Sequence, residues 1–192
     1  PDPTQVADPF HVIKLANTRL DEVRRRVQQE TLGHRGHRDD PLYRSRRLLT
    51  KGHERLDEQG EAKLLGFLEA GDPKGEVRMA WHAKETLRGL YDQPAEFAAT
   101  YLAELVESLL DRDSMPRELQ QLGRTLRRWA DEIVAWHTAQ VSNGPTEATN
   151  SLIKRVKRVG FGFRRFRNYR LRVLLYAGRP DWDLLATITP TP

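Results

Sequence analysis

Apolar residues recur at steps of three and four along most of the chain, which is the spacing of one helix face. The first stripe comprises Ile13, Ala16, Leu20, Val23 and Val27. Further stripes occupy positions 77–90 and 98–109. The last and most regular one predicts a single continuous helix and runs through Leu119, Leu122, Leu126, Trp129, Ile133 and Trp136. The pattern therefore predicts a mainly α fold.

Prolines and glycines indicate where these helices begin and end. Asp40-Pro41 predicts the start of a short helix after a polar loop at 33–40, and Gly71-Asp72-Pro73 ends another helix near 58–70. Pro145 predicts the start of a helix that reaches about Arg158. A last helix is expected near 165–177.

The front of the chain departs from the helical pattern. Residues 4–8 are partly β-favouring, and Asp8-Pro9 marks a turn or a helix cap. We therefore expect one short strand near residues 4–8. Such a strand has no ladder partner in this sequence, and even a two-stranded unit is marginal. Either the strand does not form, or its sheet lies in sequence that is missing here.

Composition narrows the class of protein. Of 192 residues, 38% are hydrophobic and 31% are charged, which suffices for a packed core. The absence of cysteine excludes a disulfide scaffold and Cys-ligated zinc. His34 and His37 are three residues apart but lack the further ligands of a known metal pattern. No apolar run approaches the length of a membrane span, so no membrane partner is expected.

The net charge of +5 is concentrated near the C-terminal end of the sequence. Residues 143–179 hold ten Lys or Arg and one acid, Glu147, which gives +9 and leaves −4 for the other 155 residues. A local field of this size indicates a polyanionic partner.

Glu147 lies at the head of this basic segment. On a helix that starts at Pro145, Glu147 shares a face with Asn150, Ser151, Lys154 and Arg158. A carboxylate that holds a divalent cation, next to cations that hold phosphates, suits metal-dependent phosphoryl transfer on DNA. Two simpler interpretations stay open. A first-turn glutamate complements the helix dipole, and a basic face can be merely solvated.

Four aromatic residues interleave with arginines after this helix. Arg164, Arg165 and Arg167 alternate with rings onto which bases can stack, at Phe161, Phe163, Phe166 and Tyr169. The alternative is that these rings pack the last helix onto the protein core.

These residues resemble the closing block of bacterial transposases of the ISL-three insertion-sequence family. The resemblance rests on the run from Asn143 to Arg155, then on Gly160–Arg164, Asn168–Arg170 and Leu174–Gly178. The opening segment Ala7–Val12, which contains Asp8 and His11, resembles a second landmark of the family. Together the matching regions span residues 5 to 182.

The resemblance implies an acid-triad transposase with a ribonuclease-H-like core. In that family two aspartates and a glutamate hold two divalent cations, normally Mg²⁺, while water and then a DNA 3′-hydroxyl attack phosphodiester bonds. It places the catalytic and metal-binding glutamate at Glu147. Asp8 and His11 belong to a family motif of unknown role, and we do not expect Asp8 in the triad. Both triad aspartates are expected to be absent from this chain, so we expect it to be inactive alone.

The resemblance also implies a domain plan. Residues 1–30 would end the ribonuclease-H-like core, 31–140 would be a helical insertion, 141–180 would be the C-terminal core helices, and 181–192 a flexible tail.

The implied partner is double-stranded DNA at the transposon ends. The resemblance also implies a cytoplasmic, nucleoid-associated bacterial protein, for which a homo-oligomer is possible. The expected DNA contacts are Asn150, Lys154, Arg155, Lys157, Arg158, Arg164, Arg165 and Arg167. Two other functions remain as alternatives: a non-catalytic helical DNA-binding module, and a helical scaffold.

Overall fold

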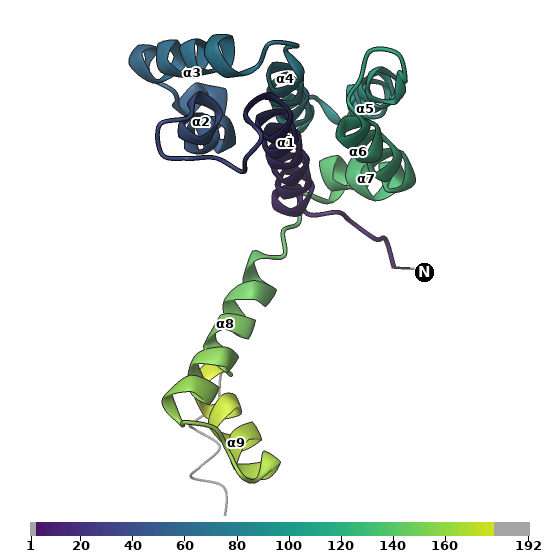
Figure 1. Cartoon of the computed structure of the whole chain (residues 1–192). Coiled ribbons are helices and arrows are strands. Elements are labelled where there is room, and N and C mark those ends of the chain that lie inside the picture. The colour runs from purple at the N-terminus through teal and green to yellow at the C-terminus, as the bar shows by residue number, and fades with distance from the viewer. Residues whose placement is uncertain (1–2, 179–192) are drawn as a thin grey trace, which may run out of the picture. The chain divides into compact units, whose positions relative to one another are not determined.

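A computed structural model describes residues 3–178 of the chain, which divides into two compact units, residues 1–141 and 142–192 (Figure 1). The described residues form helices and no strand, so the expected mainly α fold is confirmed. The first unit contains α1 (Pro9–Leu32), α2 (Pro41–Thr50), α3 (Glu58–Gly71), α4 (Glu76–Gly89), α5 (Ala95–Leu110), α6 (Arg117–Arg128) and α7 (Ala130–Ala139), with short 3₁₀ turns at His53–Arg55 and Leu90–Asp92. The second contains α8 (Gly144–Val159) and α9 (Phe166–Ala177). No described helix is both long and apolar enough to cross a membrane.

Helix α1 is the centre of the first unit. It packs against α4 and α6, while α2 pairs with α3 and α5 pairs with α6 and α7 (Figure 1). The apolar stripes predicted from the sequence supply the core: Leu20 and Val23 of α1, Leu87 of α4 and Leu102 of α5 are almost fully buried. Residues 9–32 therefore share one core with the helices that follow.

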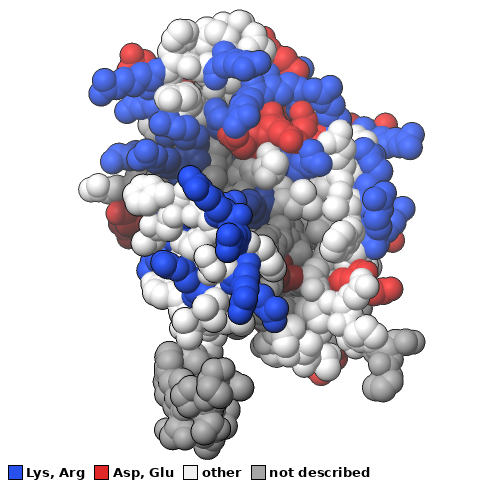
Figure 2. Space-filling view, turned by 90° about the horizontal axis from the view of Figure 1, so that it is seen from below, with Lys and Arg blue, Asp and Glu red and all other residues white. Residues whose placement is uncertain are grey.

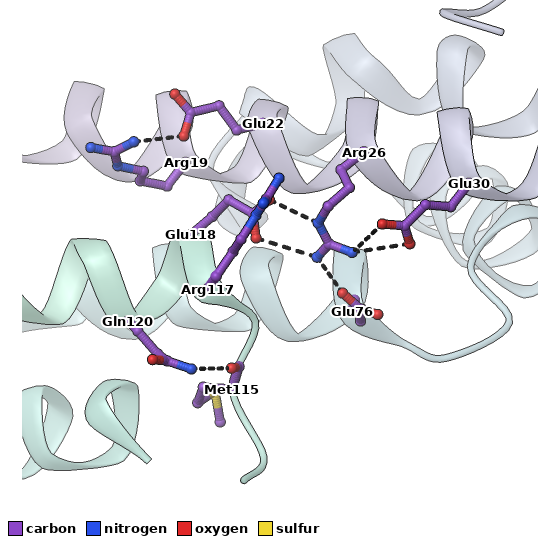
Figure 3. A network of polar contacts seen from close by, with 9 residues as sticks. All are labelled: Arg19, Glu22, Arg26, Glu30, Glu76, Met115, Arg117, Glu118 and Gln120. Atoms are coloured by element: carbon purple, nitrogen blue, oxygen red, sulfur yellow. Dashed lines mark hydrogen bonds and ion pairs between the residues drawn. The ribbon is translucent and has the colours of Figure 1, made fainter. Parts of the chain in front are cut away.

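Arg26 on α1 connects three helices at the edge of this core. Its guanidinium group binds Glu118 of α6, with Nε 2.8 Å from Oε1, and also binds Glu76 of α4 and Glu30 of α1 (Figure 3). The hydrogen bond that Arg26 donates to the Glu118 carboxylate is the largest of the effects that raise the pKa of Arg26. Because the Glu118 side chain is only 6% exposed, the pair fixes α1 against α6.

A second buried charge joins α4 to the end of α2. Lys84 is 1% exposed, and its Nζ donates to the carbonyl oxygens of Leu49 at 2.7 Å and Lys51 at 2.6 Å. It also pairs with Glu85. Helix ends leave carbonyl groups unsatisfied, so this lysine satisfies two carbonyl groups at the end of α2, in addition to the bond from the Lys51 N–H to the Leu48 carbonyl.

The strand expected near residues 4–8 does not form. The structure describes these residues without regular structure, and no strand exists among residues 3–178 to pair with them. Instead, the N–H of Ala7 donates to the carbonyl oxygen of Glu132 in the first turn of α7, at 2.8 Å. A β-favouring composition cannot produce a ladder without a second strand.

The prediction of a single helix over the stripe from Leu119 to Trp136 is also wrong, because the helix is interrupted at Trp129. This residue has φ −109° and ψ 20°, and its N–H is shared between the carbonyls of Thr125 and Leu126. The break separates α6 from α7, and α7 packs on α5 and α1. Trp129 itself is 52% exposed, whereas Ile133 beyond the break is buried.

The second unit is a helical hairpin in which α8 and α9 contact each other. The observed bounds of α8 and α9 agree with the expected helices at 145–158 and 165–177. No side chain of either helix is buried. The flexible tail expected at 181–192 lies outside the described residues.

Candidate nucleic-acid interface

The sequence around Pro145 starts α8 at a defined point. Proline fits the first helical turn because its missing N–H has no intrahelical partner there. The carbonyl oxygen of Asn143 accepts the N–H of Glu147 at 2.9 Å, which is the first helical bond. The hydroxyl of Thr149 donates back to the Pro145 carbonyl at 3.0 Å. Glu147 is thereby held in the first turn of α8.

The helix presents its polar row to solvent. Glu147, Asn150, Ser151, Lys154 and Arg158 are all exposed. Of the apolar row, Leu152 and Val156 are half-buried, whereas Ala148 and Val159 are exposed. The predicted face thus brings the carboxylate of Glu147 and the cations of Lys154 and Arg158 onto one side of the helix. Lys157 joins Arg158 in the last turn.

A tight turn ends α8 and directs the chain into α9. The N–H groups of Phe161 and Gly162 donate to the carbonyls of Arg158 at 3.1 Å and Lys157 at 3.2 Å. These two bonds are those of a Schellman motif. Phe161 adopts the left-handed conformation at φ +50°, which non-glycine residues rarely do, and Gly162 follows at φ +93°.

The four aromatic residues differ in exposure: Phe163 and Tyr169 are half-buried, whereas Phe161 and Phe166 are exposed, and the Phe166 ring lies 6.3 Å from that of Tyr169. Phe163 and Tyr169 pack on each other, with ring centroids 5.3 Å apart, and the guanidinium of Arg172 lies 5.7 Å from the Phe163 ring. Phe161 is fully exposed and Phe166 is 75% exposed. Phe163 and Tyr169 therefore contact each other within the second unit, whereas Phe161 and Phe166 expose ring surface that is accessible to a partner.

A groove of about 350 Å³ lies between the two helices of this unit. Its wall includes Val156 and Val159 of α8 and Leu175 of α9, and Arg155 and Arg172 contribute guanidinium groups from the two helices. The groove therefore offers apolar surface next to positive charge.

The cations expected to contact DNA are all exposed. Figure 2 shows Lys and Arg side chains exposed on the face that it draws. The exposed set consists of Lys154, Arg155, Lys157, Arg158, Arg164, Arg165 and Arg167, and Asn150 is exposed with them. These side chains are in a position to meet phosphate oxygens.

The described residues do not form a divalent-cation site on their own. Across residues 3–178, no group of three or more His, Asp or Glu side chains is arranged to hold a metal ion. Glu147 is the one acid between residues 143 and 178. Because a two-cation site needs several carboxylates at a spacing of about 4 Å, Glu147 could supply one ligand of such a site.

Asp8 and His11 lie in the first unit, at the start of α1. Asp8 is the N-cap of this helix, and its Oδ1 accepts the N–H of Phe10 at 2.8 Å. His11 is exposed on the first turn, with its ring 5.4 Å from that of Phe10. The structure thus confirms a helix cap, one of the two alternatives that Asp8-Pro9 indicated in the sequence.

Sequence reasoning missed a second group of arginines, which lies in the first unit. Arg24, Arg25, Arg35 and Arg46 line one groove with Arg26. The signals were the run Arg24-Arg25-Arg26 and the close spacing of Arg44, Arg46 and Arg47. Both signals were overlooked because the net charge of the 155 residues outside 143–179 was summed to −4, which averages local arginine clusters with acidic residues elsewhere.

Comparisons with known proteins agree with this picture. A family described as "Transposase", of the ISL-three type, matches residues 1–173. The transposases for insertion sequence element IS1557 from two strains of Mycobacterium tuberculosis, CDC 1551 and H37Rv, are 31% identical over 184 residues, covering 85% of this chain and 40% of theirs. A Lactococcus lactis protein named ATP-dependent protease is 35% identical over 72 residues, which cover 38% of this chain and 23% of that protein.

No solved structure matches the chain. The chain spans about 40% of the length of the curated transposases that it matches. The family match, by contrast, covers 173 of the 192 residues. The chain therefore belongs to the ISL-three family of transposases.

Proposed function

We propose that this chain is part of a DNA transposase and that its second unit contacts the DNA on which phosphoryl transfer occurs. The observation that carries the proposal is the exposed face of α8, where Glu147 heads a row with Asn150, Lys154 and Arg158. Family membership supports the same function. The partner is double-stranded DNA at the ends of an insertion sequence.

The cations of the second unit would bind the DNA backbone. Arginine forks bind two phosphate oxygens at once, and lysines add point charges. Neutralised phosphates release counterions, so binding depends steeply on salt. Contacts of this kind position a protein on the duplex without reading its sequence.

Glu147 would supply one carboxylate of an acid triad in a ribonuclease-H-like core. As the family resemblance implies, the other two carboxylates of the triad would come from parts of a complete family member outside this segment. A divalent cation, normally Mg²⁺, stabilises charge on the attacking and leaving oxygens of an in-line displacement. Glu147 contributes the fixed negative charge that such an ion requires.

A second candidate function is a non-catalytic helical DNA-binding module. The observation that favours it is that residues 3–178 contain no group of three or more His, Asp or Glu side chains arranged to hold a metal ion. In that case Glu147 would act only on the dipole and free amides at the start of α8. The two functions differ in what the loss of the Glu147 charge does.

The test is made in a complete family member that contains this segment. Glu147→Gln preserves size and hydrogen bonding but removes the charge. The matched control is Glu96→Gln, at an exposed glutamate in the first turn of α5. We expect Glu147→Gln to abolish Mg²⁺-dependent strand cleavage while DNA retention in a gel stays unchanged, and the control to keep both. Cleavage that survives in Glu147→Gln contradicts the proposal.

A further inference from the structure

We propose that a groove on the first unit, formed by α1, the loop at 33–40 and α2, is a second binding site for the phosphate backbone of double-stranded DNA. The groove has a volume of about 870 Å³. Its five arginines are Arg24, Arg25, Arg26, Arg35 and Arg46. Asp21 is the single acid in its lining. Because Arg24 is paired with Asp21 and Arg26 with glutamates beside the groove, the positive charge available to a ligand is that of Arg25, Arg35 and Arg46.

Buried polar contacts hold the groove in shape. Arg24 is 5% exposed and donates to Asp21 Oδ1 at 2.9 Å through Nε and to Gln28 Oε1 at 3.2 Å through Nη1. Gln28, which is fully buried, donates in turn to Asp40 Oδ2 at 3.0 Å. Asp40 also accepts the N–H of His37 at 2.5 Å. This chain of bonds fixes the loop against α1 and the start of α2.

A glycine allows the loop to approach this closely. Gly36 has φ +117°, a conformation that other residues avoid. A Cβ at this position would collide with the amide group of Gln28 and come within 3.0 Å of the Tyr43 ring. The loop that carries Arg35 is therefore seated between α1 and α2 before any ligand arrives.

Three of the five arginines are placed to meet a ligand. The side chain of Arg25 is 67% exposed and shares the Asp21 carboxylate with Arg24. Arg35 is exposed, and no ion pair within residues 3–178 includes it. Arg46 lies over the Tyr43 ring, 3.8 Å from its centroid, and donates to the Tyr43 carbonyl at 2.7 Å. Its guanidinium plane is thus oriented without a carboxylate partner.

This arrangement suits a phosphodiester chain. Three guanidinium groups on three different elements can contact successive phosphates, and the ring-held Arg46 loses less side-chain freedom on binding than a free arginine would. Arg24 is paired with Asp21, and Arg26 is paired with Glu30, Glu76 and Glu118, so these two arginines shape the wall of the groove and do not contact the ligand. The site rests on the proposed function in one respect, namely that duplex DNA is the partner of this protein.

The test measures how the affinity of the full chain for a fluorescent DNA duplex depends on salt, by anisotropy. The variant carries Arg25→Gln, Arg35→Gln and Arg46→Gln. Each lost phosphate contact lowers the slope of log affinity against log salt by about 0.9, so we expect a decrease of about 2.7. The matched control, Arg112→Gln with Arg124→Gln and Arg128→Gln, removes three exposed arginines elsewhere in the first unit. The control should lower the slope by less than about 0.9.

Further variants separate this site from the one on α8. A variant with alanine at Lys154, Arg155, Lys157 and Arg158 tests the α8 site. Adding the three groove substitutions, which we call the groove triple, to that variant should still lower the slope of log affinity against log salt. This result holds even if α8 proves not to bind DNA. Arg→Lys at the three groove positions should keep the slope and weaken affinity, because the charge stays while the fork is lost.

Three outcomes overturn the proposal. One is equal slopes for the groove triple and the unmodified chain, with circular dichroism showing both folded. Another is an equal decrease in the control triple, which would make the effect one of general charge. The last is a groove that binds polyglutamate but does not contribute to DNA binding, which would assign it to an acidic protein.

Discussion

The first unit encloses an apolar core in which charged residues are buried with partners, whereas the second unit buries no side chain between residues 142 and 178 and exposes its cations. Lys84, Arg24 and Glu118 are buried, and each has hydrogen-bond partners. Lys154, Arg155 and Arg158 are exposed. The buried charges of the first unit connect its helices, while the charged side chains of α8 are exposed, and we expect that they are not needed for folding.

The apolar residues of the two units differ in the same way. Leu87 of α4 has no exposed surface, but Leu174 and Tyr176 of α9 are 54% and 55% exposed. Two helices alone cannot enclose their own apolar residues, since burial requires further layers. The second unit therefore derives little stability from its own packing.

The largest effect is expected when the same substitution, leucine to alanine, is made in each unit and the free energy of unfolding is compared. Leu87→Ala should lower the free energy of unfolding by about 2–5 kcal/mol, because it leaves a cavity in a filled core. Leu174→Ala should change it by at most about 0.5 kcal/mol, as at other exposed sites. Urea denaturation followed by circular dichroism measures both. Equal losses would show that the hairpin is packed as tightly as the core.

A buried and an exposed lysine make the next comparison. Lys84→Met removes the donor to the Leu49 and Lys51 carbonyls and should cost about 2–3 kcal/mol of unfolding free energy. Lys154→Met, on the exposed face of α8, should cost no more than about 0.5 kcal/mol. Thermal and urea unfolding provide the values. A neutral Lys84→Met would mean that these carbonyls find other partners.

The third comparison concerns how the stability of the first unit depends on acidic pH through the buried Glu118. Burial raises the pKa of Glu118, but the hydrogen bond and charge of Arg26 more than offset this, so the pKa lies below its ordinary value of 4.5. The unfolded chain then binds more protons than the folded chain as pH falls below 4.5, and stability is lost there.

We expect Glu118→Gln to lower stability by about 2 kcal/mol at neutral pH. We also expect it to flatten the decline in stability below pH 4.5, since the glutamine does not titrate. Urea midpoints measured at a series of pH values test this. An unchanged acid profile would show that the Arg26 network does not contribute to folding.

Local sequence patterns predicted those parts of the fold that depend on local geometry. The bounds of α8 followed from Pro145 and the glycine at position 160, and the exposed row at offsets of three and four followed from helix geometry. The break at Trp129 could not be predicted, because the apolar stripe continues in register across it. Packing of α7 on α5 and α1 determines where the chain turns.

The same distinction applies to the candidate sites. The cations of α8 lie close together in sequence, so one helix brings them together. The groove of the first unit needs Gln28 and Asp40, from separate elements, to seat the loop that carries Arg35. In the sequence, Lys84 is a polar residue next to the apolar stripe of α4, which does not predict burial. It is buried because the carbonyl groups of Leu49 and Lys51, from another element, accept its hydrogen bonds.

The measurement that tests the central claim most directly combines stability and DNA binding in one variant of the full chain. Lys154, Arg155, Lys157 and Arg158 are changed to alanine, and the control changes Arg112, Arg124, Arg127 and Arg128, which are exposed in the first unit. If charge on α8 serves a partner, the variant should unfold at the same urea concentration as the unmodified chain. Its slope of log affinity for duplex DNA against log salt should fall by about 3.6, which is about 0.9 for each lost contact, and far more than in the control. An unchanged slope, or a loss of stability in place of a loss of binding, would contradict the account.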